Sequence, residues 1–197
     1  LRYAVEDSKN GCAYSLYNII TPKVGLSYIE NMNFSKIVQQ DYTLSSGLGG
    51  LHHGTNTVEM ANAYSTLENH GEYRQADCIS SILDASGNEI YEEPESKTVY
   101  TRSASDQMTD ILEGVLNSSA GTAKGLKWSS ASDVAAAAKT GTTNDNNVAW
   151  FCGYTPYYTI SVWVGYDYPK SVKGLWGNTY PAYIWKEAML YMIDGKD

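Results

Sequence analysis

Cysteine and histidine are scarce in this sequence, which contains three of each among 197 residues. Cys12, Cys78 and Cys152 have no metal-ligand spacing with one another or with a histidine, so we expect no metal site. A glycine-rich segment, residues 45–54, lacks the Gly-Lys-Ser/Thr ending of a phosphate loop, and no other pattern indicates a cofactor. Cys152 lies in an apolar run, which predicts a buried thiol.

Clusters of basic residues and long apolar runs are also absent. The 14 basic and 22 acidic residues give a formal net charge of -8, which argues against a nucleic-acid partner. No apolar run reaches membrane-spanning length, and no signal peptide is present. Because the chain opens on Leu1 and reads as helix from the start, we expect a piece of a longer protein. A membrane contact would be made only through an anchor outside this sequence.

What the sequence does contain is enough apolar residues, 43%, for one globular core. Helical patterns come first, an antiparallel meander follows, and a helix rich in aromatics ends the chain. This order predicts an α/β (α+β) fold in which an antiparallel sheet is flanked by helices. We expect a helical region over about residues 1–125, then sheet strands and a terminal helix over about residues 133–195.

Apolar periodicity and turn residues place the individual elements. Helices are expected at residues 1–6, 13–20, 22–31, 55–70, 103–116 and 181–193. Strands are expected at residues 78–83 and 89–91 and in three runs, from about 135, at 148–154 and at 158–166. Thr57 is expected to cap the helix of residues 55–70, with Val58 among the side chains of its buried face, and Gly71 to end it.

The most informative motif is Lys139-Thr140-Gly141-Thr142, which follows a run of alanines and precedes two strand-like runs. It places a cation, two hydroxyls and a position without a side chain on an expected sheet edge. That combination suits a carboxylate ligand held beside an exposed backbone N–H. Taken alone, the motif is equally well explained by a solvated lysine and two ordinary strand threonines.

A second candidate is Ser8-Lys9-Asn10, expected in a turn between two helices. The serine hydroxyl can relay a proton, and the asparagine amide can both donate to and accept from a peptide. Serine and asparagine in such a turn are more often helix caps. The triplet Ser86-Gly87-Asn88 has the same spacing but is explained by hairpin geometry.

Together these residues resemble the class A, bifunctional penicillin-binding proteins. Ser8-Lys9-Asn10 is similar to their Ser-x-Asn motif, and Lys139-Thr140-Gly141-Thr142 to their third motif. The resemblance extends through residues 139–167, KTGTTNDNNVAWFCGYTPYYTISVWVGYD, and includes residues 1–4, 48–50 and 57–64. It implies that residues 1–197 are the C-terminal portion of a penicillin-binding transpeptidase domain.

The sequence departs from the family pattern in one respect. The family attacks with the serine of a Ser-x-x-Lys motif, yet no lysine here has Ser or Thr three positions before it. In the family that motif precedes Ser-x-Asn, so the nucleophile is expected upstream of Leu1. The resemblance then implies a D,D-transpeptidase that acts on peptidoglycan stem peptides on the extracytoplasmic face of a bacterial membrane. β-Lactams would acylate the same serine.

The resemblance also implies a role for each motif residue. Ser8 and Lys139 are expected to be catalytic, with the ammonium supplying positive potential and helping Ser8 to move a proton. Thr140 and Thr142 are expected to hold the terminal carboxylate of the substrate. The backbone N–H of Thr142 would form half of the oxyanion hole.

Two further residues are expected to bind substrate. Gly141 would allow the substrate backbone to approach closely. Asn10 would orient the acyl side of the substrate. These roles predict that the Ser8 hydroxyl lies near the Lys139 ammonium and that Asn10 opens onto the same groove, whereas Ser86-Gly87-Asn88 lies far away.

Three other interpretations remain open at this stage. A non-catalytic sensor or a degenerate peptidoglycan-binding domain of the same fold would also lack Ser-x-x-Lys. A serine β-lactamase would need a residue that activates the deacylating water, and none is marked here. A structural surface protein with a chance triplet would not explain the long resemblance.

Overall fold

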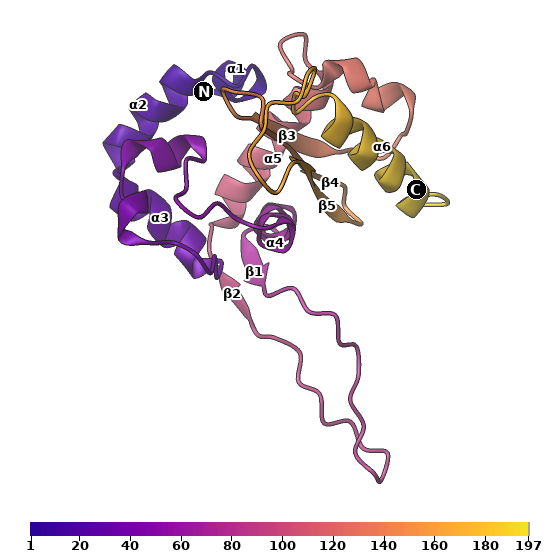
Figure 1. Cartoon of the computed structure of the whole chain (residues 1–197). Helices are drawn as coiled ribbons and strands as arrows, with labels where there is room; N and C mark the ends of the chain where they lie inside the picture. Colours follow the sequence, from indigo (N-terminus) through magenta and orange to yellow (C-terminus); the bar gives the residue numbers. More distant parts are fainter. Residues whose placement is uncertain (197) are drawn as a thin grey trace.

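The structure, a computed structural model, describes residues 1–196 of the chain. Helices and a three-stranded sheet make up the body, and one long arm projects from it (Figure 1). The α-helices are α1 (Arg2–Glu6), α2 (Asn10–Ile20), α3 (Pro22–Asn31), α4 (Thr57–Glu68), α5 (Arg102–Asn117) and α6 (Tyr180–Met192). Short 3-10 helices are η1 (Gln39–Asp41), η2 (Leu44–Leu48), η3 (Lys124–Leu126) and η4 (Trp128–Ser130).

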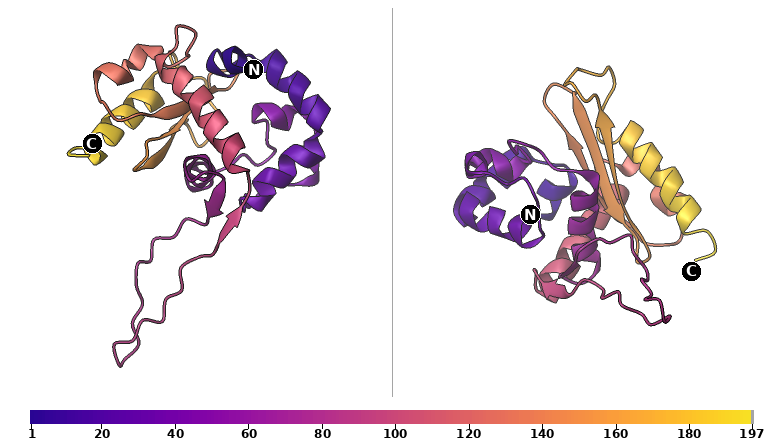
Figure 2. Two further views of the ribbon diagram at one scale, coloured as in Figure 1. Left: turned by 180° about the vertical axis from the view of Figure 1, so that it is seen from behind. Right: turned by 60° about the horizontal axis from the view of Figure 1, so that its bottom comes forward.

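The sheet contains β3 (Ala137–Thr142), β4 (Val148–Tyr154) and β5 (Thr159–Gly165), paired antiparallel in that order. Lys139 is paired with Cys152, and Gly141 with Trp150. Helix α6 covers one face of the sheet, and α4 and α5 lie on the other (Figure 2). The predicted antiparallel sheet flanked by helices is confirmed, and β3 is an edge strand.

Aromatic rings fill the core between the sheet and α6. The ring centroid of Trp185 lies 5.1 Å from those of both Trp128 and Phe151, and its indole N–H donates to the Gly153 carbonyl over 3.1 Å. Small residues on the sheet permit the close approach of Trp185: a Cβ on Gly153 would lie 2.8 Å from the Cβ of Ala138 and 2.9 Å from the Trp185 ring. The alanine run at the start of β3 is therefore explained by close packing.

Most predicted helices are confirmed, with two corrections at their N-termini. Helix α2 begins at Asn10, three residues earlier than expected, so Asn10 is helical and does not lie in the preceding turn. Helix α4 is capped by Asn56 instead of Thr57, because Asn56 Oδ1 accepts a 2.9 Å hydrogen bond from the backbone N–H of Glu59. Asparagine is also the better N-cap of the two.

The buried face of α4 also differs from the prediction. Val58 is 61% exposed, while Asn62 and Thr66 are the buried side chains of the helix. Thr66 can be buried because its hydroxyl donates to the Asn62 carbonyl over 2.9 Å. The helix ends at Glu68 with Asn69 as its C-cap, so Gly71 is not the cap residue that was predicted. His70 takes the left-handed position, with a φ of 54°, and the N–H of Gly71 donates to the Thr66 carbonyl over 2.8 Å.

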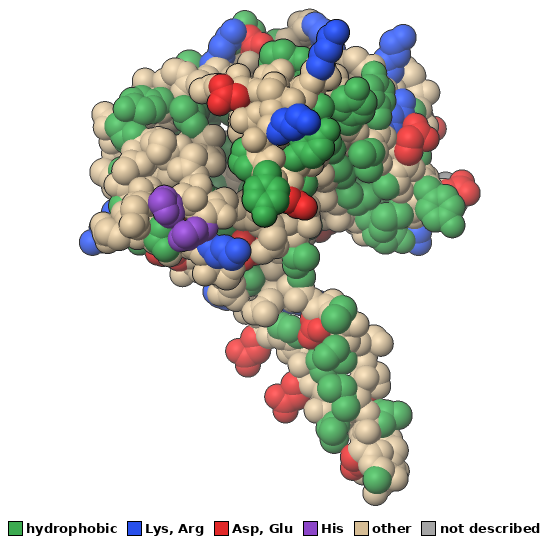
Figure 3. Space-filling view, in the orientation of Figure 1, with side chains coloured by type: hydrophobic (Ala, Val, Ile, Leu, Met, Phe, Trp, Pro, Cys, Tyr) green, Lys and Arg blue, Asp and Glu red, His purple; other side chains and the backbone are tan. Residues whose placement is uncertain are grey.

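The arm, residues 75–95, connects β1 (Glu72–Arg74) to β2 (Ser96–Thr98), which pair with each other at its base. The strands predicted at residues 78–83 and 89–91 are wrong: only one bridge, Leu83 to Glu89, joins them. Ile79, Ile82 and Ile90 are exposed along the arm, because it projects away from any surface on which they could be buried (Figure 3). An isolated pair of strands without such a surface is only marginally stable.

Candidate active site

Ser8 and Lys139 meet across the molecule. The Lys139 ammonium donates a 2.8 Å hydrogen bond to Ser8 Oγ, although 131 positions separate the two residues. Lys139 also donates to the carbonyl of Thr140 over 2.9 Å. The predicted proximity of the Ser8 hydroxyl to the Lys139 ammonium is confirmed.

Ser8 occupies an unusual backbone conformation for its residue type. Its φ of 54° is left-handed, and it follows the C-cap residue of α1, Asp7. The backbone N–H of Ser8 donates to the Val5 carbonyl, and that of Lys9 donates to the Ala4 carbonyl over 2.8 Å. This hydrogen-bond pattern is that of a Schellman motif, in which glycine usually occupies the left-handed position. A serine in this position adopts the left-handed conformation at a cost that glycine would not incur.

The hydroxyl of Ser8 is not a helix cap. The N-cap residue of α2 is Lys9, and no side-chain hydrogen bond caps this helix. The only hydrogen bond found for the Ser8 hydroxyl within residues 1–196 is the one from Lys139. The helix-cap interpretation of Ser8 is therefore wrong.

Lys139 is partly buried, and this burial lowers the pKa of its ammonium from 10.5 to about 8. Within residues 1–196 no carboxylate lies within ion-pair distance of Lys139 Nζ to restore that pKa. The group can therefore exchange its proton near neutral pH. A lysine that is partly buried, lacks a carboxylate partner and bonds to a hydroxyl is suited to proton transfer.

Thr140 and Thr142 flank Gly141, which has no side chain. The hydroxyl of Thr140 is 2.8 Å from that of Thr122, and Thr142 Oγ1 accepts a 2.9 Å hydrogen bond from the backbone N–H of Gly177. Gly177 must be a glycine, because a Cβ there would lie 2.7 Å from the carbonyl oxygen of Gly141. The segment before α6 thus packs directly on the motif.

The outer edge of β3 presents a backbone N–H. The N–H of Thr143 donates to the Val148 carbonyl over 3.0 Å, toward β4. Successive N–H groups on a strand point in opposite directions, so the N–H of Thr142 points away from β4. It lies on the free edge, where a ligand can accept from it.

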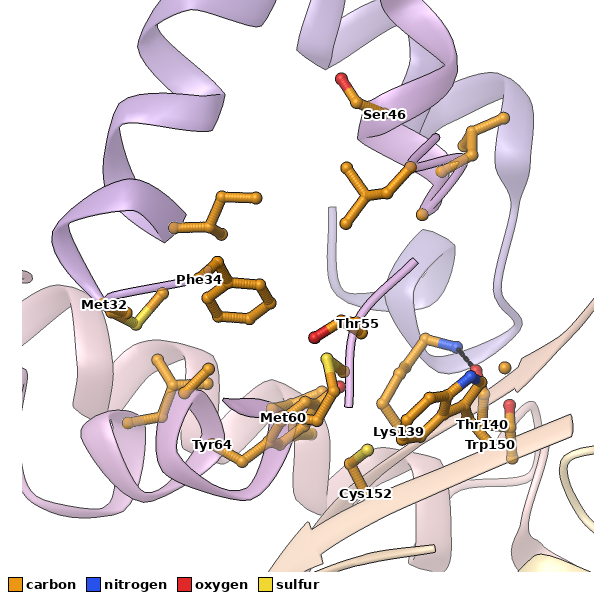
Figure 4. Close-up of a pocket in the computed structure, with 18 of the residues that line it drawn as sticks. Met32, Phe34, Ser46, Thr55, Met60, Tyr64, Lys139, Thr140, Trp150 and Cys152 are labelled. Atoms are coloured by element: carbon orange, nitrogen blue, oxygen red, sulfur yellow. Dashed lines mark hydrogen bonds between the residues drawn. The ribbon is translucent and has the colours of Figure 1, made fainter. Parts of the chain in front are cut away.

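A groove of about 750 Å³ lies between the motif strand and the helices. Lys139 and Trp150 lie on its sheet side, and Met32 and Phe34 belong to the opposite wall (Figure 4). The wall is largely apolar, so the groove combines one buried cation with a large surface for a non-polar occupant.

Asn10 is placed differently from the prediction. It lies in the exposed first turn of α2, and its amide forms no hydrogen bond within residues 1–196. It is also not among the residues that line the groove, so the expected opening of Asn10 onto the groove is not observed.

The triplet Ser86-Gly87-Asn88 lies at the tip of the arm, far from β3, as predicted (Figure 1). Asp84 Oδ1 accepts from the backbone N–H groups of Ser86 and Asn88, and Gly87 has a left-handed φ of 85°. These bonds account for all three residues as turn formers.

The sequence did not single out Thr122, Gly177 or Asn178. Thr122 lies in a loop of small residues, and the segment before α6 contains no recognisable motif. Asn178 Nδ2 donates to the Thr122 carbonyl over 2.9 Å, which joins the two segments beside the motif strand. No local sequence pattern marks such contacts.

The buried thiol predicted at Cys152 is confirmed. Cys152 is buried, its Sγ is 3.1 Å from Ser161 Oγ, and burial raises the pKa of the thiol to about 11. Cys12 and Cys78 are exposed and free.

Nowhere in residues 1–196 are three or more His, Cys, Asp or Glu side chains grouped as metal ligands. Over the same range, every helix is too short or too polar to cross a bilayer.

Comparison with known proteins gives one consistent result. Residues 1–190 match the family model of the penicillin binding protein transpeptidase domain. Penicillin-binding protein 4 of Bacillus subtilis is 33% identical over 184 residues, which is 93% of this chain and 29% of that protein. Penicillin-binding protein 1A of Clostridium novyi is 34% identical over 174 residues, which is 87% of this chain and 20% of that protein. The chain thus spans less than a third of the length of these relatives.

Solved structures share the fold at lower sequence identity. The crystal structure of penicillin-binding protein 1A from Haemophilus influenzae superposes with a TM-score of 0.84 at 18% identity, over 100% of this chain and 34% of that one. The PonA1 protein from Mycobacterium tuberculosis, in complex with penicillin V, superposes with a TM-score of 0.82 at 24% identity, over 100% of this chain and 57% of that one.

Proposed function

The chain belongs to the transpeptidase domain family of class A penicillin-binding proteins, and we propose that it is the C-terminal portion of a working D,D-transpeptidase domain. In the complete enzyme a serine attacks the D-Ala-D-Ala end of a peptidoglycan stem peptide and expels the last D-Ala. The amine of a neighbouring strand then takes the acyl group and forms a cross-link. Splitting the transfer through an acyl-enzyme replaces one difficult step by two easier ones.

The nucleophilic serine lies upstream of Leu1 in this proposal, within a Ser-x-x-Lys motif. Two observations support that placement. No lysine of the sequence has Ser or Thr three positions before it, and the chain spans less than a third of its curated relatives. The largely apolar groove of about 750 Å³ beside Lys139 offers space for an upstream segment that brings the serine to the motif.

The main support for the proposal is the hydrogen bond between Ser8 and Lys139. As the bond between the acyl carbon and D-Ala breaks, Ser8 donates its hydroxyl proton to the departing amine and receives a proton from the Lys139 ammonium. Both transfers need heavy atoms within about 2.6–3.2 Å, and the Ser8–Lys139 separation of 2.8 Å lies in that range. Because burial lowers the pKa of Lys139 to about 8, the ammonium gives up its proton readily.

The motif strand holds the substrate. Thr142 Oγ1 already accepts from Gly177, so its own O–H proton remains for the terminal carboxylate. Thr140 contributes its hydroxyl, which also bonds to that of Thr122, and Gly141 leaves room for the substrate backbone. The N–H of Thr142 on the free edge donates to the oxyanion that develops in the transition state.

The same site is expected to accept β-lactams, whose strained amide imitates the scissile bond and whose carboxylate imitates the peptide terminus. The substrates place the enzyme on the extracytoplasmic face of the membrane, with its anchor in a part of the protein outside this chain.

Intact mass spectrometry tests the proposal. The full-length protein is expected to gain one penicilloyl group on a serine upstream of Leu1, located by peptide mapping, and the isolated chain to gain none. A stable adduct on the isolated chain would contradict the placement of the nucleophile. Tight but non-covalent binding by the full-length protein would favour the alternative, a sensor or degenerate peptidoglycan-binding domain of the same fold.

A further inference from the structure

Thr122 bonds to three separate segments that together form the proposed site. Its backbone N–H donates to the Glu6 carbonyl over 3.1 Å, its carbonyl accepts from Asn178 Nδ2 over 2.9 Å, and its hydroxyl lies 2.8 Å from that of Thr140. Glu6 is two residues before Ser8, and Thr140 directly follows Lys139. The hydroxyl of Thr122 therefore contacts the motif strand directly, and its backbone groups bond to the segment before Ser8 and to the segment before α6.

The loop that carries Thr122 is fixed on a rigid base. The N–H of Gly121 donates to the Ser118 carbonyl, and the N–H of the buried Ala123 donates to the carbonyl of Val115 over 3.0 Å. A Cβ on Gly121 would lie 2.5 Å from that same carbonyl oxygen of Val115, so the loop lies tight against the end of α5. Thr122 thus has little freedom to move relative to the helix.

Hydroxyl chemistry links this geometry to substrate binding. A hydroxyl donates one hydrogen bond and accepts up to two. If Thr122 donates to Thr140, the single proton of Thr140 is free to be donated to a carboxylate. Without the Thr122 hydroxyl, the Thr140 hydroxyl loses the partner that fixes its rotation, and part of its hydrogen bonding to a ligand is lost.

We propose that Thr122 is a positioning residue that orients the Thr140 hydroxyl toward the carboxylate of the stem peptide or β-lactam and ties the Ser8 turn to the motif strand. The inference rests on the proposed function of the site. It predicts an effect that depends on the carboxylate of the ligand, which a purely structural role for Thr122 would not produce.

The test uses the full-length protein and compares Thr122→Val, which keeps the shape of the side chain, with Thr122→Ser, which keeps the hydroxyl. Thr109→Val is the matched control, because Thr109 also makes a 2.8 Å hydroxyl–hydroxyl bond, to Tyr154, but outside the groove. Acylation by penicillin V and by its methyl ester is measured in competition with a fluorescent penicillin.

Thr122→Val is expected to lower the acylation efficiency of penicillin V roughly 3- to 10-fold, as the loss of one hydrogen bond implies. Thr122→Ser and Thr109→Val should stay within about twofold of the parent, the scatter of a neutral change. With the methyl ester, all three variants should be acylated as efficiently as the parent protein. The inference would be overturned if Thr122→Val lost the same acylation efficiency with penicillin V and with its methyl ester, or lost none with either.

Asn178→Ala provides a second variant if Thr122→Val does not fold, because Asn178 is exposed. Removing its amide frees the Thr122 carbonyl, and the variant should lose less acylation efficiency than Thr122→Val, again only with penicillin V and not with its methyl ester. If Asn178→Ala loses no acylation efficiency with penicillin V, the inference is overturned. A parent protein that penicillin V does not acylate would instead contradict the proposed function.

Discussion

Ser8 accepts a 2.8 Å hydrogen bond from Lys139 while its own backbone is held left-handed, at a φ of 54°. The conformation is costly for any residue with a Cβ, and the hydroxyl gains from it a position beside the partly buried Lys139. Stability and the proposed proton relay therefore make opposite demands at this residue.

Replacing Ser8 separates these demands. Ser8→Gly should be more stable than Ser8→Ala by roughly 0.5–1.5 kcal/mol, because glycine adopts the left-handed conformation freely. Both variants of the full-length protein should lose about 10²–10⁴-fold in acylation rate, since both lack the proton relay. Thermal unfolding and acylation by a fluorescent penicillin check the two effects, and a Ser8→Gly protein that reacts at the parent rate would exclude the relay.

Lys139→Ala in the full-length protein should lower the acylation rate by about 10²–10⁴-fold. Lys36→Ala is the matched control, because Lys36 is an exposed lysine that does not line the groove. The same fluorescent-penicillin assay measures both. Equal rates for the two variants would remove Lys139 from the mechanism.

Much of the motif strand could be predicted from the sequence, because strand runs and short links place Lys139 on an edge of an antiparallel sheet. The Ser8–Lys139 contact could be predicted as well, but from the chemistry that the family resemblance implies and not from periodicity. The arm shows the opposite case: its two strand-like runs are joined by a single bridge and do not form strands, because no surface buries Ile79 or Ile82.

The contacts of Thr122 could not be predicted. They reach residues 18, 56 and 116 positions away, and a threonine in a loop of small residues has no local signal for any of them. Asn10 could not be placed either, since serine, lysine and asparagine before an apolar run fit both a turn and the first turn of a helix. Such positions are decided by tertiary packing.

Helix α6 offers a stability test of the aromatic core. Trp185→Ala should destabilise the protein by about 3–5 kcal/mol, because the ring is fully buried against Trp128 and Phe151 and a cavity would remain. Tyr191→Ala, on the same helix but 86% exposed, should change stability by about 0.5 kcal/mol or less. Denaturant unfolding measures both, and similar losses would show that the packing against the sheet is not as described.

The three cysteines should differ in reactivity. Cys12 and Cys78 are exposed and should react with a maleimide in the native protein, whereas burial protects Cys152 and raises its pKa to about 11. Peptide mapping after brief labelling should find the first two modified and the third only after denaturation. Cys152→Ala should leave the native pattern unchanged, and rapid labelling of Cys152 would mean that β4 opens readily.

Lys139 should make stability depend on pH in a defined window. Burial lowers its pKa from 10.5 to about 8, so between these values the unfolded chain holds a proton that the folded chain has lost. Unfolding then takes up a proton, and stability rises with pH through this window. Burial also raises the pKa of Cys152 to about 11 and that of Tyr154 to about 12, which lowers stability as pH increases.

Comparing the parent with Lys139→Met isolates the lysine, because the cysteine and tyrosine contributions are common to both proteins. Lys139→Met should be the more stable protein at pH 7, since it removes an unpaired charge from a buried position. The difference should shrink by on the order of 2–3 kcal/mol as the pH rises from 7.5 to 10, and unfolding free energies measured across that range check it. A constant difference would mean that the ammonium is as well solvated in the folded protein as in water, and Lys139 would then have no reason to release its proton to Ser8.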